Sequence, residues 1–375
     1  MTKDKKKVAI VMNDFIVGGV QKLAVDQMNL LKGEFDFVLI TLMQFPRGDF
    51  YHLVPEGVKV YKLNFKGFFD IRSLIKLTRI LIKEKPQIVK TAMFLSNTII
   101  RVLKIFFGFV VITAEHNTET KRPASHRFLN KLLSKLTYTI IADSNTVADH
   151  VSHVEKIPRS KFTVIYNGVE INEIEKSKKE FSEKREEIRK EISASENELV
   201  FLTVARLVIQ KNHDLMIRGF TKYLTKGGIG KLVIIGDGIL MNELKKLSKD
   251  LNVENSVIFL GERQDIYRFY AVSDFFLLTS LREGFCISAM NGLAFGLPLI
   301  STRVAGVVEY LKDGKNGYFF DDTEESVSDT LIKVSSLSDS DLNKMKTNAE
   351  ETSKDFSVEV HAEKYRKLFN ECLKK

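Results

Sequence analysis

The chain has 375 residues, of which 44% are hydrophobic and 28% are charged. This length favours two domains, and the composition is typical of a globular protein rather than a disordered one. The longest apolar run, Ile105–Ile112, has eight residues, whereas a membrane-spanning helix needs about 20. The basic start, MTKDKKKVAIVM, lacks the apolar length and cleavage site of a signal peptide. Two cysteines, Cys286 and Cys372, are too few for a disulfide framework or a cysteine-rich zinc site. We therefore expect a cytoplasmic protein.

The net charge of +9 is concentrated in the first half of the chain. Residues 1–170 contain 26 Lys and Arg against 15 Asp and Glu, whereas the remainder contains 31 against 33. Several cations share one face of a predicted basic helix within residues 68–86, at spacings of four, three and four: Arg72, Lys76, Arg79 and Lys83. They form either a solvated helix face or a surface for anionic lipid headgroups at the inner face of the membrane, or for a phosphate-bearing acceptor. Nucleic acid is not an expected partner, because the basic segments lack interleaved aromatic residues in a recognisable module.

Strand and helix patterns alternate through residues 1–170. The expected strands are Lys7–Met12, Phe37–Leu42, Val58–Leu63, Ile88–Met93, Val110–His116, Thr139–Ser144 and the segment FTVIYNGV. The expected helices are Val20–Leu31, the basic helix, Thr98–Phe106 and Arg127–Lys135. Strands separated by helices of roughly 10 to 15 residues predict a parallel, doubly wound sheet.

A charged segment then separates two such patterns. Residues 171–198 are crowded with opposite charges and nearly free of strand signal, which is typical of an exposed helical connector. The strand pattern resumes over residues 199–355, at Leu199–Leu207, Leu232–Gly238, Ser256–Glu262, Asp274–Ser280 and Leu297–Arg303. The fold class is therefore α/β, with two Rossmann-like domains whose parallel sheets face each other across a cleft. A final helix, residues 356–375, is expected to pack back toward the first domain.

In such sheets ligands bind at the carboxyl ends of the strands, so residues that follow strands are the candidates. Gly18 and Gly19 precede a predicted helix, where backbone amides favour a phosphate, although a simple turn would have the same pattern. His116 ends a strand, where it would either bind a substrate hydroxyl or be a structural histidine. Arg206 and Lys211 follow another strand and suit a diphosphate, with surface charge as the alternative.

The segment REGFCISAMNGLAFG predicts a loop and then a helix from about Cys286 to Phe295. Glu283 lies in the loop, and the free amides that begin the helix favour phosphate or sugar oxygens. These amides follow Gly284 and belong to residues Phe285, Cys286 and Ile287. Asn291 lies roughly 7 Å further along the helix axis, so that it would reach another part of the same extended ligand.

Three other patterns have simpler interpretations. The cluster Gly227–Gly230 precedes a strand and is interpreted as a loop. His150 and His153 have the spacing of a metal pair, but no carboxylate or cysteine accompanies them. The sequence Asp339-Ser340-Asp341 opens a helical pattern and is interpreted as N-terminal capping.

Taken in order, the motifs resemble the retaining, nucleotide-sugar-dependent glycosyltransferases of family four, which have the two-domain fold called type B. The pieces that carry the resemblance cover nearly the whole chain: the Gly18-Gly19 loop, AEHN, VIYNGV, ARL with KNHDLMIRGF, LVIIGDG, VIFLGERQDI, SDFFLLTSLREGF, GLPLISTRVAGVVEYL and KNGYFF. The resemblance implies that Arg206 and Lys211 neutralise the donor diphosphate and that Glu283 contacts the transferred sugar. It also implies that His116 lies near the sugar and that Arg263 borders the nucleobase.

Two residues depart from the family pattern. Asn291 stands where a second glutamate normally binds the ribose, and an amide loses the strength of a charged acceptor. Gln21 stands where a glutamate often follows the paired glycines. The resemblance implies transfer, with retention, from a nucleotide-diphosphate sugar such as a UDP-sugar, without a metal or another cofactor. The implied acceptor is a glycan or a lipid-linked molecule of bacterial surface polysaccharide or glycoconjugate synthesis. A sugar-nucleotide epimerase and a catalytically inactive binding partner are the alternatives.

Overall fold

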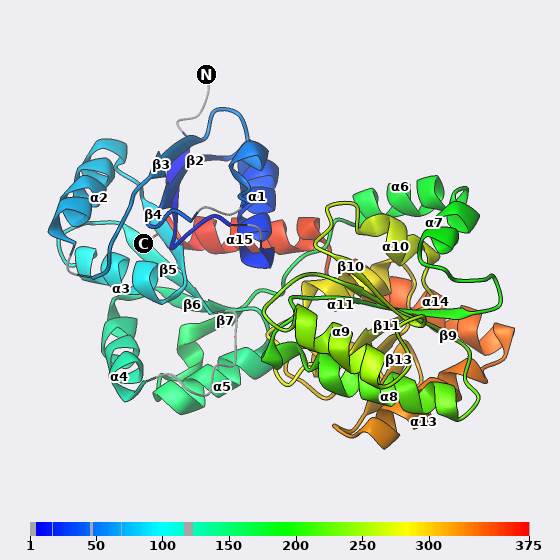
Figure 1. The fold of residues 1–375 in the computed structure, drawn as a ribbon. Coiled ribbons are helices and arrows are strands. Elements are labelled where there is room, and N and C mark those ends of the chain that lie inside the picture. The colour runs from blue at the N-terminus through cyan, green and yellow to red at the C-terminus, as the bar shows by residue number, and fades with distance from the viewer. Residues whose placement is uncertain (1–4, 17, 46–47, 69, 116–122, 375) are drawn as a thin grey trace. The chain divides into compact units, whose positions relative to one another are not determined.

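The computed structural model describes residues 5–16, 18–45, 48–68, 70–115 and 123–374 (Figure 1). The chain divides into two compact units. Unit 1 contains Met1–Gly168 together with Val358–Lys375, and unit 2 contains Val169–Ser357. No helix among the described residues is both long and apolar enough to cross a bilayer.

Unit 1 is built on a seven-stranded parallel sheet with the order β3-β2-β1-β4-β5-β6-β7. Its central strands β1, β2 and β4 are mostly apolar, with many β-branched residues, and most of their residues are buried, as parallel strands between helices require. The strands are β1 (Lys6–Met12), β2 (Phe35–Thr41), β3 (Lys59–Lys62), β4 (Ile88–Ala92), β5 (Val110–Glu115), β6 (Thr139–Ala142) and β7 (Phe162–Val164).

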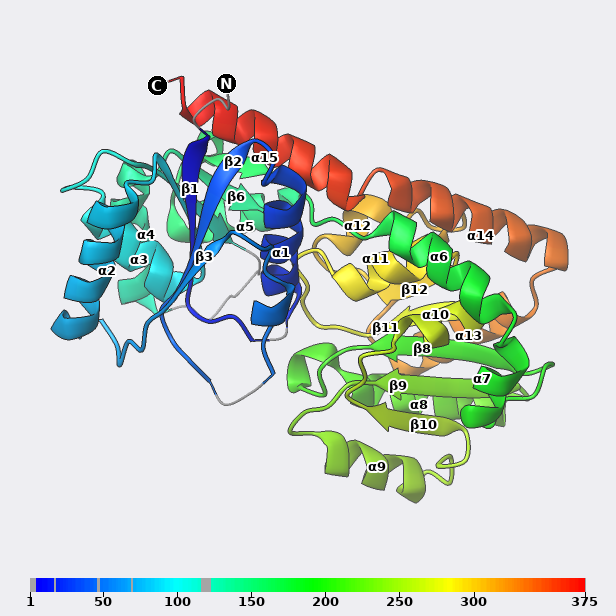
Figure 2. The ribbon, with the colours of Figure 1, turned by 90° about the horizontal axis from the view of Figure 1, so that it is seen from above.

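Helices cover both faces of this sheet. The helices are α1 (Gly19–Leu31), α2 (Ile71–Glu84), α3 (Phe94–Leu103), α4 (Ala124–Leu133), α5 (Asn145–Glu155) and α15 (Val358–Cys372), with short 3₁₀ turns at Tyr51–Leu53, Ser134–Leu136 and Arg159–Lys161. Apolar residues of α1 and α15 form one core with one face of β1, and those of α2 and α3 form a second core with the other face. Figure 2 shows α2, α3 and α4 on one side of the strands and α1 and α15 on the other.

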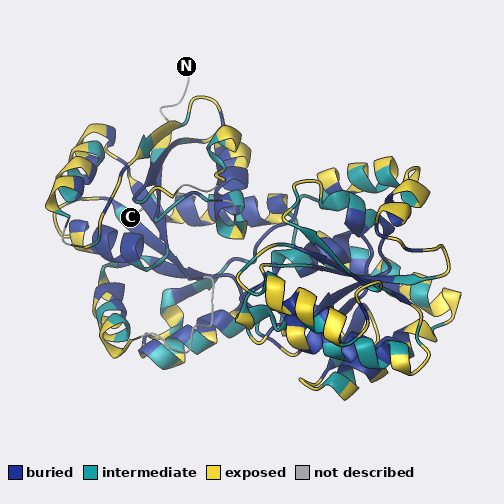
Figure 3. Ribbon diagram, in the orientation of Figure 1, coloured by how far each residue is buried: buried dark blue, intermediate teal, exposed yellow. Residues whose placement is uncertain are grey.

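Unit 2 contains a six-stranded parallel sheet with the order β10-β9-β8-β11-β12-β13. Its strands are β8 (Leu199–Val204), β9 (Gly230–Ile235), β10 (Val257–Gly261), β11 (Phe275–Leu278), β12 (Leu299–Thr302) and β13 (Gly317–Phe320). Its helices are α6 (Ile171–Ser182), α7 (Arg185–Glu191), α8 (His213–Thr225), α9 (Met241–Asp250), α10 (Tyr267–Val272), α11 (Ile287–Ala294), α12 (Val307–Tyr310), α13 (Glu324–Ser335) and α14 (Asp339–Lys354), with a 3₁₀ turn at Ile209–Lys211. The dark central strands in Figure 3 show that both sheets are buried. The prediction of two parallel-sheet α/β domains is confirmed.

Residues 171–198 differ from the exposed connector that their charge pattern suggested. They form α6 and α7, which pack against α10 and belong to unit 2. Ile174 and Ile188 are buried, and the buried Arg189 guanidinium donates to the carbonyl oxygens of Val272 and Ser195 at 3.0 and 2.7 Å. A few well-placed apolar residues and one buried arginine therefore outweigh the charged composition of this segment.

Candidate active site

The centre of the unit 2 sheet is a topological switch point. From β8 the chain continues outward through β9 and β10 on one side, and from the adjacent β11 it continues through β12 and β13 on the other. The loops that follow β8 and β11 therefore diverge at the carboxyl edge of the sheet, which is where α/β proteins bind ligands. Arg206 and Lys211 follow β8, and Glu283 follows β11.

Hydrogen bonds connect these two loops. The Leu281 amide donates to the Gln210 carbonyl oxygen at 2.9 Å, and the Gln210 side chain donates to the Arg282 carbonyl oxygen at 2.8 Å. The Thr279 hydroxyl donates to the carbonyl oxygens of Lys211 and Asn212 at 3.1 and 2.9 Å. These hydrogen bonds between the two loops thus fix the positions of Lys211 and Glu283 relative to each other.

Lys211 and Glu283 form an ion pair with little exposure to water. The Lys211 Nζ atom lies 2.6 Å from Glu283 Oε1, and the two side chains are 17% and 7% exposed. The Ser280 hydroxyl donates to the same Oε1 atom at 2.6 Å. Both donors converge on one carboxylate oxygen, so Glu283 is held in a single orientation.

Burial opposes the charge of Lys211, but its neighbours outweigh burial. Burial alone would lower the pKa of the Lys211 amine, whereas the charge of Glu283 and its hydrogen bond with the amine raise it, so that the pKa lies above its ordinary value. Burial, followed by the charge of Glu283, raises the pKa of the Cys286 thiol to about 11. The site therefore keeps a cationic lysine and a neutral thiol near neutral pH.

Arg206 provides a second positive charge in the same region. It is exposed, its charge opposes that of Lys211, and among the described residues no carboxylate forms an ion pair with it. Its backbone is fixed by the loop after β9, where Gly236 and Gly238 pack closely against the chain on either side of Arg206. A Cβ atom on Gly236 would lie 2.0 Å from the Ala205 carbonyl oxygen, and one on Gly238 would lie 2.3 Å from that of Leu207. These two glycines let one loop approach the other.

The loop between Glu283 and α11 is tightly packed. Gly284, Phe285 and Cys286 are buried, and Cys286 takes the left-handed conformation with φ of 62° at the N-cap of α11. The helix starts at Ile287, within a residue of the predicted position, and no side-chain oxygen caps its first turn. Its first amides are therefore oriented to bind an oxygen ligand.

The loop after β12 packs against the loop that contains Glu283. Gly306 has φ of 73°, and a Cβ atom there would lie 1.9 Å from the Gly284 carbonyl oxygen. The Tyr310 hydroxyl donates to the Phe285 carbonyl oxygen at 2.9 Å, and the Thr302 hydroxyl donates to that of Ser280 at 2.8 Å. Sequence reasoning did not single out Ser280 or Gly306. For Ser280 a signal existed, since it ends a strand pattern three residues before Glu283.

Asn291 lies in the second turn of α11 and is buried, with 9% of the residue exposed. Its side chain interacts with the hydroxyl of Tyr270, and that hydroxyl donates to the Ser288 carbonyl oxygen at 2.9 Å. Gly292 packs against the Phe276 ring, where a Cβ atom would approach to about 3 Å. The amide thus lies between the polar start of the helix and an aromatic core.

Arg263 is not part of this group of residues. It follows β10, the edge strand, which β9 and β8 separate from β11. Its guanidinium is bound by Asp265 at 2.7 and 2.6 Å and by Glu191 at 3.2 Å. A role beside a nucleobase stays a prediction.

His213 was also missed by sequence reasoning. It is the first residue of α8 and is 1% exposed, and neither ring nitrogen has a hydrogen-bond partner among the described residues. Burial and then the charge of Lys211 lower the pKa of its imidazole to about 4, so that it is neutral near neutral pH. His213 is therefore a buried, neutral residue near Lys211 and does not add a third positive charge to the site.

In unit 1, Gly18 is the N-cap of α1 and Gly19 is its first residue. The Gln21 amide donates to Asp14 Oδ1 at 2.9 Å, and a Cβ atom on Gly18 would lie 2.7 Å from Gln21 Oε1. The uncharged Gln21 side chain therefore closes the glycine loop by donating a hydrogen bond to the Asp14 carboxylate. His116 lies outside the described residues.

The sequence around Asp339 begins α14, where the hydroxyl of the N-cap Ser338 accepts from the Asp341 amide at 3.1 Å, which confirms capping.

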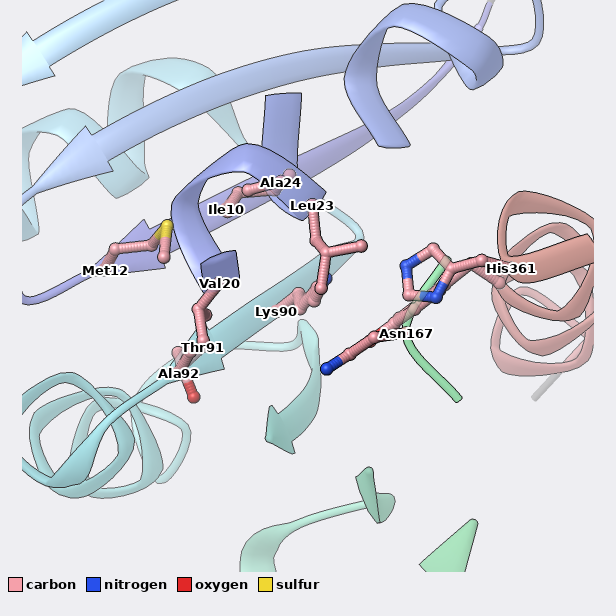
Figure 4. A pocket seen from close by; sticks show the side chains of 11 residues that line it. Ile10, Met12, Val20, Leu23, Ala24, Lys90, Thr91, Ala92, Asn167 and His361 are labelled. Atoms are coloured by element: carbon pink, nitrogen blue, oxygen red, sulfur yellow. The ribbon is translucent and has the colours of Figure 1, made fainter. Parts of the chain in front are cut away.

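A small cavity of about 20 Å³ lies in unit 1 (Figure 4), and it has room for about one water molecule. Lys90 of β4 lines it, together with residues of β1, α1 and α15. Lys90 Nζ donates to Gln27 Oε1 at 2.5 Å and lies 4.1 Å from the centre of the Tyr365 ring. Burial lowers the pKa of Lys90 to about 7. The cavity is too small for a nucleotide sugar and is not the donor site.

Comparison with known proteins identifies the family of the chain. Residues 17–173 match the family model described as "Glycosyltransferase Family 4", and residues 184–352 match the one described as "Glycosyl transferases group 1". The chain therefore belongs to the family four glycosyltransferases, with one of these models matching each of its two halves.

A galactosyltransferase of Escherichia coli, named UDP-Gal:alpha-D-GlcNAc-diphosphoundecaprenol alpha-1,3-galactosyltransferase, is 28% identical over 351 residues, which are 89% of each chain. A crystal structure of a glycosyltransferase from Rickettsia africae covers all of both chains with a TM-score of 0.84 at 20% identity. The structure of HepE from Anabaena in complex with UDP has a TM-score of 0.82 at 16% identity and covers 97% of this chain and all of its own. The two structural likenesses show that this glycosyltransferase has their fold.

Proposed function

We propose that this glycosyltransferase transfers a sugar, with retention of anomeric configuration, from a UDP-sugar to a lipid-linked or glycan acceptor in bacterial surface polysaccharide or glycoconjugate synthesis. Two similarities support the proposal. The E. coli relative is named for a UDP-galactose donor and a diphosphoundecaprenol acceptor, and the Anabaena protein of similar fold was crystallised with UDP.

The observation that carries the proposal is the grouping of Arg206, Lys211 and Glu283 at the switch point of unit 2, beside the start of α11. Arg206 and Lys211 would bind the donor diphosphate. The first amides of α11 would bind phosphate or sugar oxygens, and Glu283 would accept hydrogen bonds from hydroxyls of the transferred sugar. Fixed charges of this kind stabilise a developing anion without reorganisation during the reaction.

The reaction breaks the bond between the anomeric carbon and the diphosphate oxygen and forms a bond from the same carbon to an acceptor oxygen. In a same-face displacement the acceptor proton moves to the leaving diphosphate, which carries the released electron pair. Two side-chain cations and a helix start can neutralise this leaving group, so we propose that the transfer needs no metal.

The test is an assay with UDP-, GDP- and ADP-sugars and with saccharide-diphosphate-lipid acceptors, measuring nucleotide release and product together. We expect UDP release that depends on the acceptor, an α-linked product from an α-linked donor by NMR, and no loss of rate in EDTA. A donor converted into an isomer without an acceptor would indicate an epimerase. No turnover with any pair of substrates would favour an inactive binding partner.

A further inference from the structure

Helix α2 buries one narrow side against the sheet of unit 1. Its buried residues are Ser73, Leu77, Leu81 and Glu84, which recur at helical spacing. The Asp70 carboxylate caps the first turn by accepting from the Ser73 amide at 3.1 Å. Leu74 and Ile80 are partly buried and pack against the same core. The opposite side of the helix is left to the outside.

The outer side of α2 carries two parallel stripes. At about 100° per residue, the isoleucines Ile71, Ile75 and Ile82 fall within about 40° of one another, and they are 69%, 46% and 56% exposed. The adjacent stripe consists of four exposed cations: Arg72, Lys76, Arg79 and Lys83. A helix face that is only solvated by water would usually be polar. The three exposed isoleucines therefore make this face apolar as well as basic.

The only carboxylate within α2, all of whose residues are described, is kept away from this outer side. Glu84 is buried and accepts from Lys7 Nζ at 2.8 Å, from Tyr61 at 2.6 Å and from Lys59 at 3.2 Å. These donors oppose its burial and lower the pKa of Glu84 to about 2. Within the fully described helix α2, no acidic residue thus offsets the positive charge of its outer side.

Helix α4 repeats this combination of apolar and basic residues. Phe128 and Leu132 are one turn apart and are 69% and 51% exposed, and Lys131 and Lys135 beside them are exposed. The helix is joined to α3 by the buried Arg101, which donates to Asn130 Oδ1 at 2.8 Å. Since α2, α3 and α4 lie on one side of the sheet (Figure 2), the outer sides of α2 and α4 both turn away from it.

We propose that the outer sides of α2 and α4, here called the basic-apolar face, bind the surface of an anionic lipid bilayer. Helices that lie in a bilayer interface place apolar side chains among the acyl chains and Lys or Arg at the headgroups, which is the arrangement of these two stripes. A second copy of the chain is a poorer occupant, because a two-fold contact would bring the same cations against each other. Nucleic acid would match the cations and leave the isoleucines in water.

The first experiment measures binding of the purified full chain to sedimented vesicles of phosphatidylcholine, with and without 30% phosphatidylglycerol, at low salt. We expect binding that needs the anionic lipid and weakens as salt is added. The triple substitution Arg72→Gln, Lys76→Gln and Lys83→Gln should reduce binding by about 100-fold, at roughly a factor of five per cation near the surface. A matched control removes three exposed lysines of α9 in unit 2, Lys245→Gln, Lys246→Gln and Lys249→Gln, and should reduce binding by less than about threefold.

A second experiment uses the absence of tryptophan from the sequence. Ile75→Trp places a single fluorophore in the isoleucine stripe, and Ile239→Trp places one at an apolar residue of unit 2 that is 82% exposed. With anionic vesicles, the emission of the first variant should shift to the blue and be quenched by brominated lipid. The emission of the second should stay that of exposed tryptophan.

Three outcomes would overturn the proposal: no binding to anionic vesicles at low salt, equal losses in the α2 and α9 variants, or the same spectral shift at both tryptophans. Self-association that Ile75→Ser abolishes, without vesicle binding, would assign the face to a second copy instead. Far-ultraviolet circular dichroism of each variant establishes that it is folded. None of these measurements depends on sugar transfer, so they succeed or fail independently of the proposed reaction.

Discussion

The two sheets each place a lysine near a topological switch point, and the two lysines are in opposite electrostatic states. In unit 2, Lys211 follows β8 and pairs with Glu283 at 2.6 Å, and its pKa lies above the ordinary value. In unit 1, Lys90 lies on β4, the neighbour of β1, under α1 and α15. Among the described residues no carboxylate pairs with Lys90, and burial lowers its pKa to about 7.

The difference teaches that the partner, rather than burial, decides whether an enclosed lysine stays charged. A buried carboxylate compensates the desolvation of Lys211 and keeps a cation ready for a diphosphate. Among the described residues, the charged end of Lys90 meets the Gln27 amide oxygen and the Tyr365 ring, which favour a cation less than a carboxylate does. The same kind of residue therefore belongs to a candidate binding site in one unit and to the core in the other.

The largest effect is expected when either member of the Lys211–Glu283 pair is removed. We expect Lys211→Met and Glu283→Gln each to reduce transfer by at least about 100-fold, as is typical when a fixed charge is lost from a transition state. Initial rates of UDP release with the best donor and acceptor measure this. Lys226→Met, which changes an exposed lysine of unit 2, is the control and should retain the rate. Near-normal turnover in both site variants would place the reaction elsewhere.

The claim that burial lowers the pKa of Lys90 can be tested by measuring how the stability of the protein depends on pH. Its pKa is about 7 in the folded chain and its ordinary value is 10.5, so between these values the unfolded chain binds the additional proton and stability rises with pH. Lys90→Met removes this contribution. The free energy of unfolding of the variant, relative to the original chain, should therefore fall by a few kcal/mol between pH 7 and pH 10.

Urea unfolding at several pH values measures this difference, and Lys245→Met on the exposed side of α9 is the control. A constant difference between Lys90→Met and the original chain across the range would mean that Lys90 is charged in the folded state.

The support of the unit 2 loop can be tested at Gly306. In Gly306→Ala the new Cβ would meet the Gly284 carbonyl oxygen, in a backbone conformation that alanine rarely adopts. We expect a loss of about 1–3 kcal/mol in stability, and UDP binding weakened by roughly tenfold because the start of α11 shifts.

Calorimetric titration with UDP measures this effect. Gly314→Ala separates strain from displacement, since Gly314 has the same φ of 73° but a Cβ atom there would approach Tyr318 only to 3.9 Å. Equal loss of UDP binding in both variants would contradict a specific role for Gly306.

The smallest effect is expected at Asn291. Asn291→Glu should preserve UDP binding or tighten it by up to about fivefold, because a carboxylate accepts hydrogen bonds from ribose hydroxyls more strongly than an amide does. The dissociation constant of UDP is the measurement. A large loss would mean that the pocket around Asn291 and Tyr270 is built for a neutral side chain.

The sequence predicted most of the architecture because apolar runs of strand length, separated by helical periods, leave few alternatives to parallel sheets. The predicted strands of unit 2 agree with β8 to β12 to within a few residues, whereas β13 was not predicted, since GYFF is too short to show a period. Helix α11 was predicted because a loop with Gly284 precedes it and Gly296 follows its end.

Other features depend on contacts between distant segments. The burial of Lys90 depends on α15, more than 260 residues later, and the need for glycine at position 306 depends on the carbonyl of Gly284. The membership of residues 171–198 in unit 2 depends on the buried Arg189, which their charged composition conceals. Local pattern cannot reveal such contacts, since each is decided by a neighbour in space.

The division of unit 1 into two segments has a consequence for synthesis. Helix α15 follows unit 2 in the chain, so the ribosome completes all of unit 2 before it supplies the helix that closes unit 1. Until then Phe35, which meets Phe369 with ring centres 5.3 Å apart, and Lys90, which lies under Tyr365, lack the contacts that α15 provides. Unit 1 is therefore begun first and completed last, after the whole of unit 2 has been made.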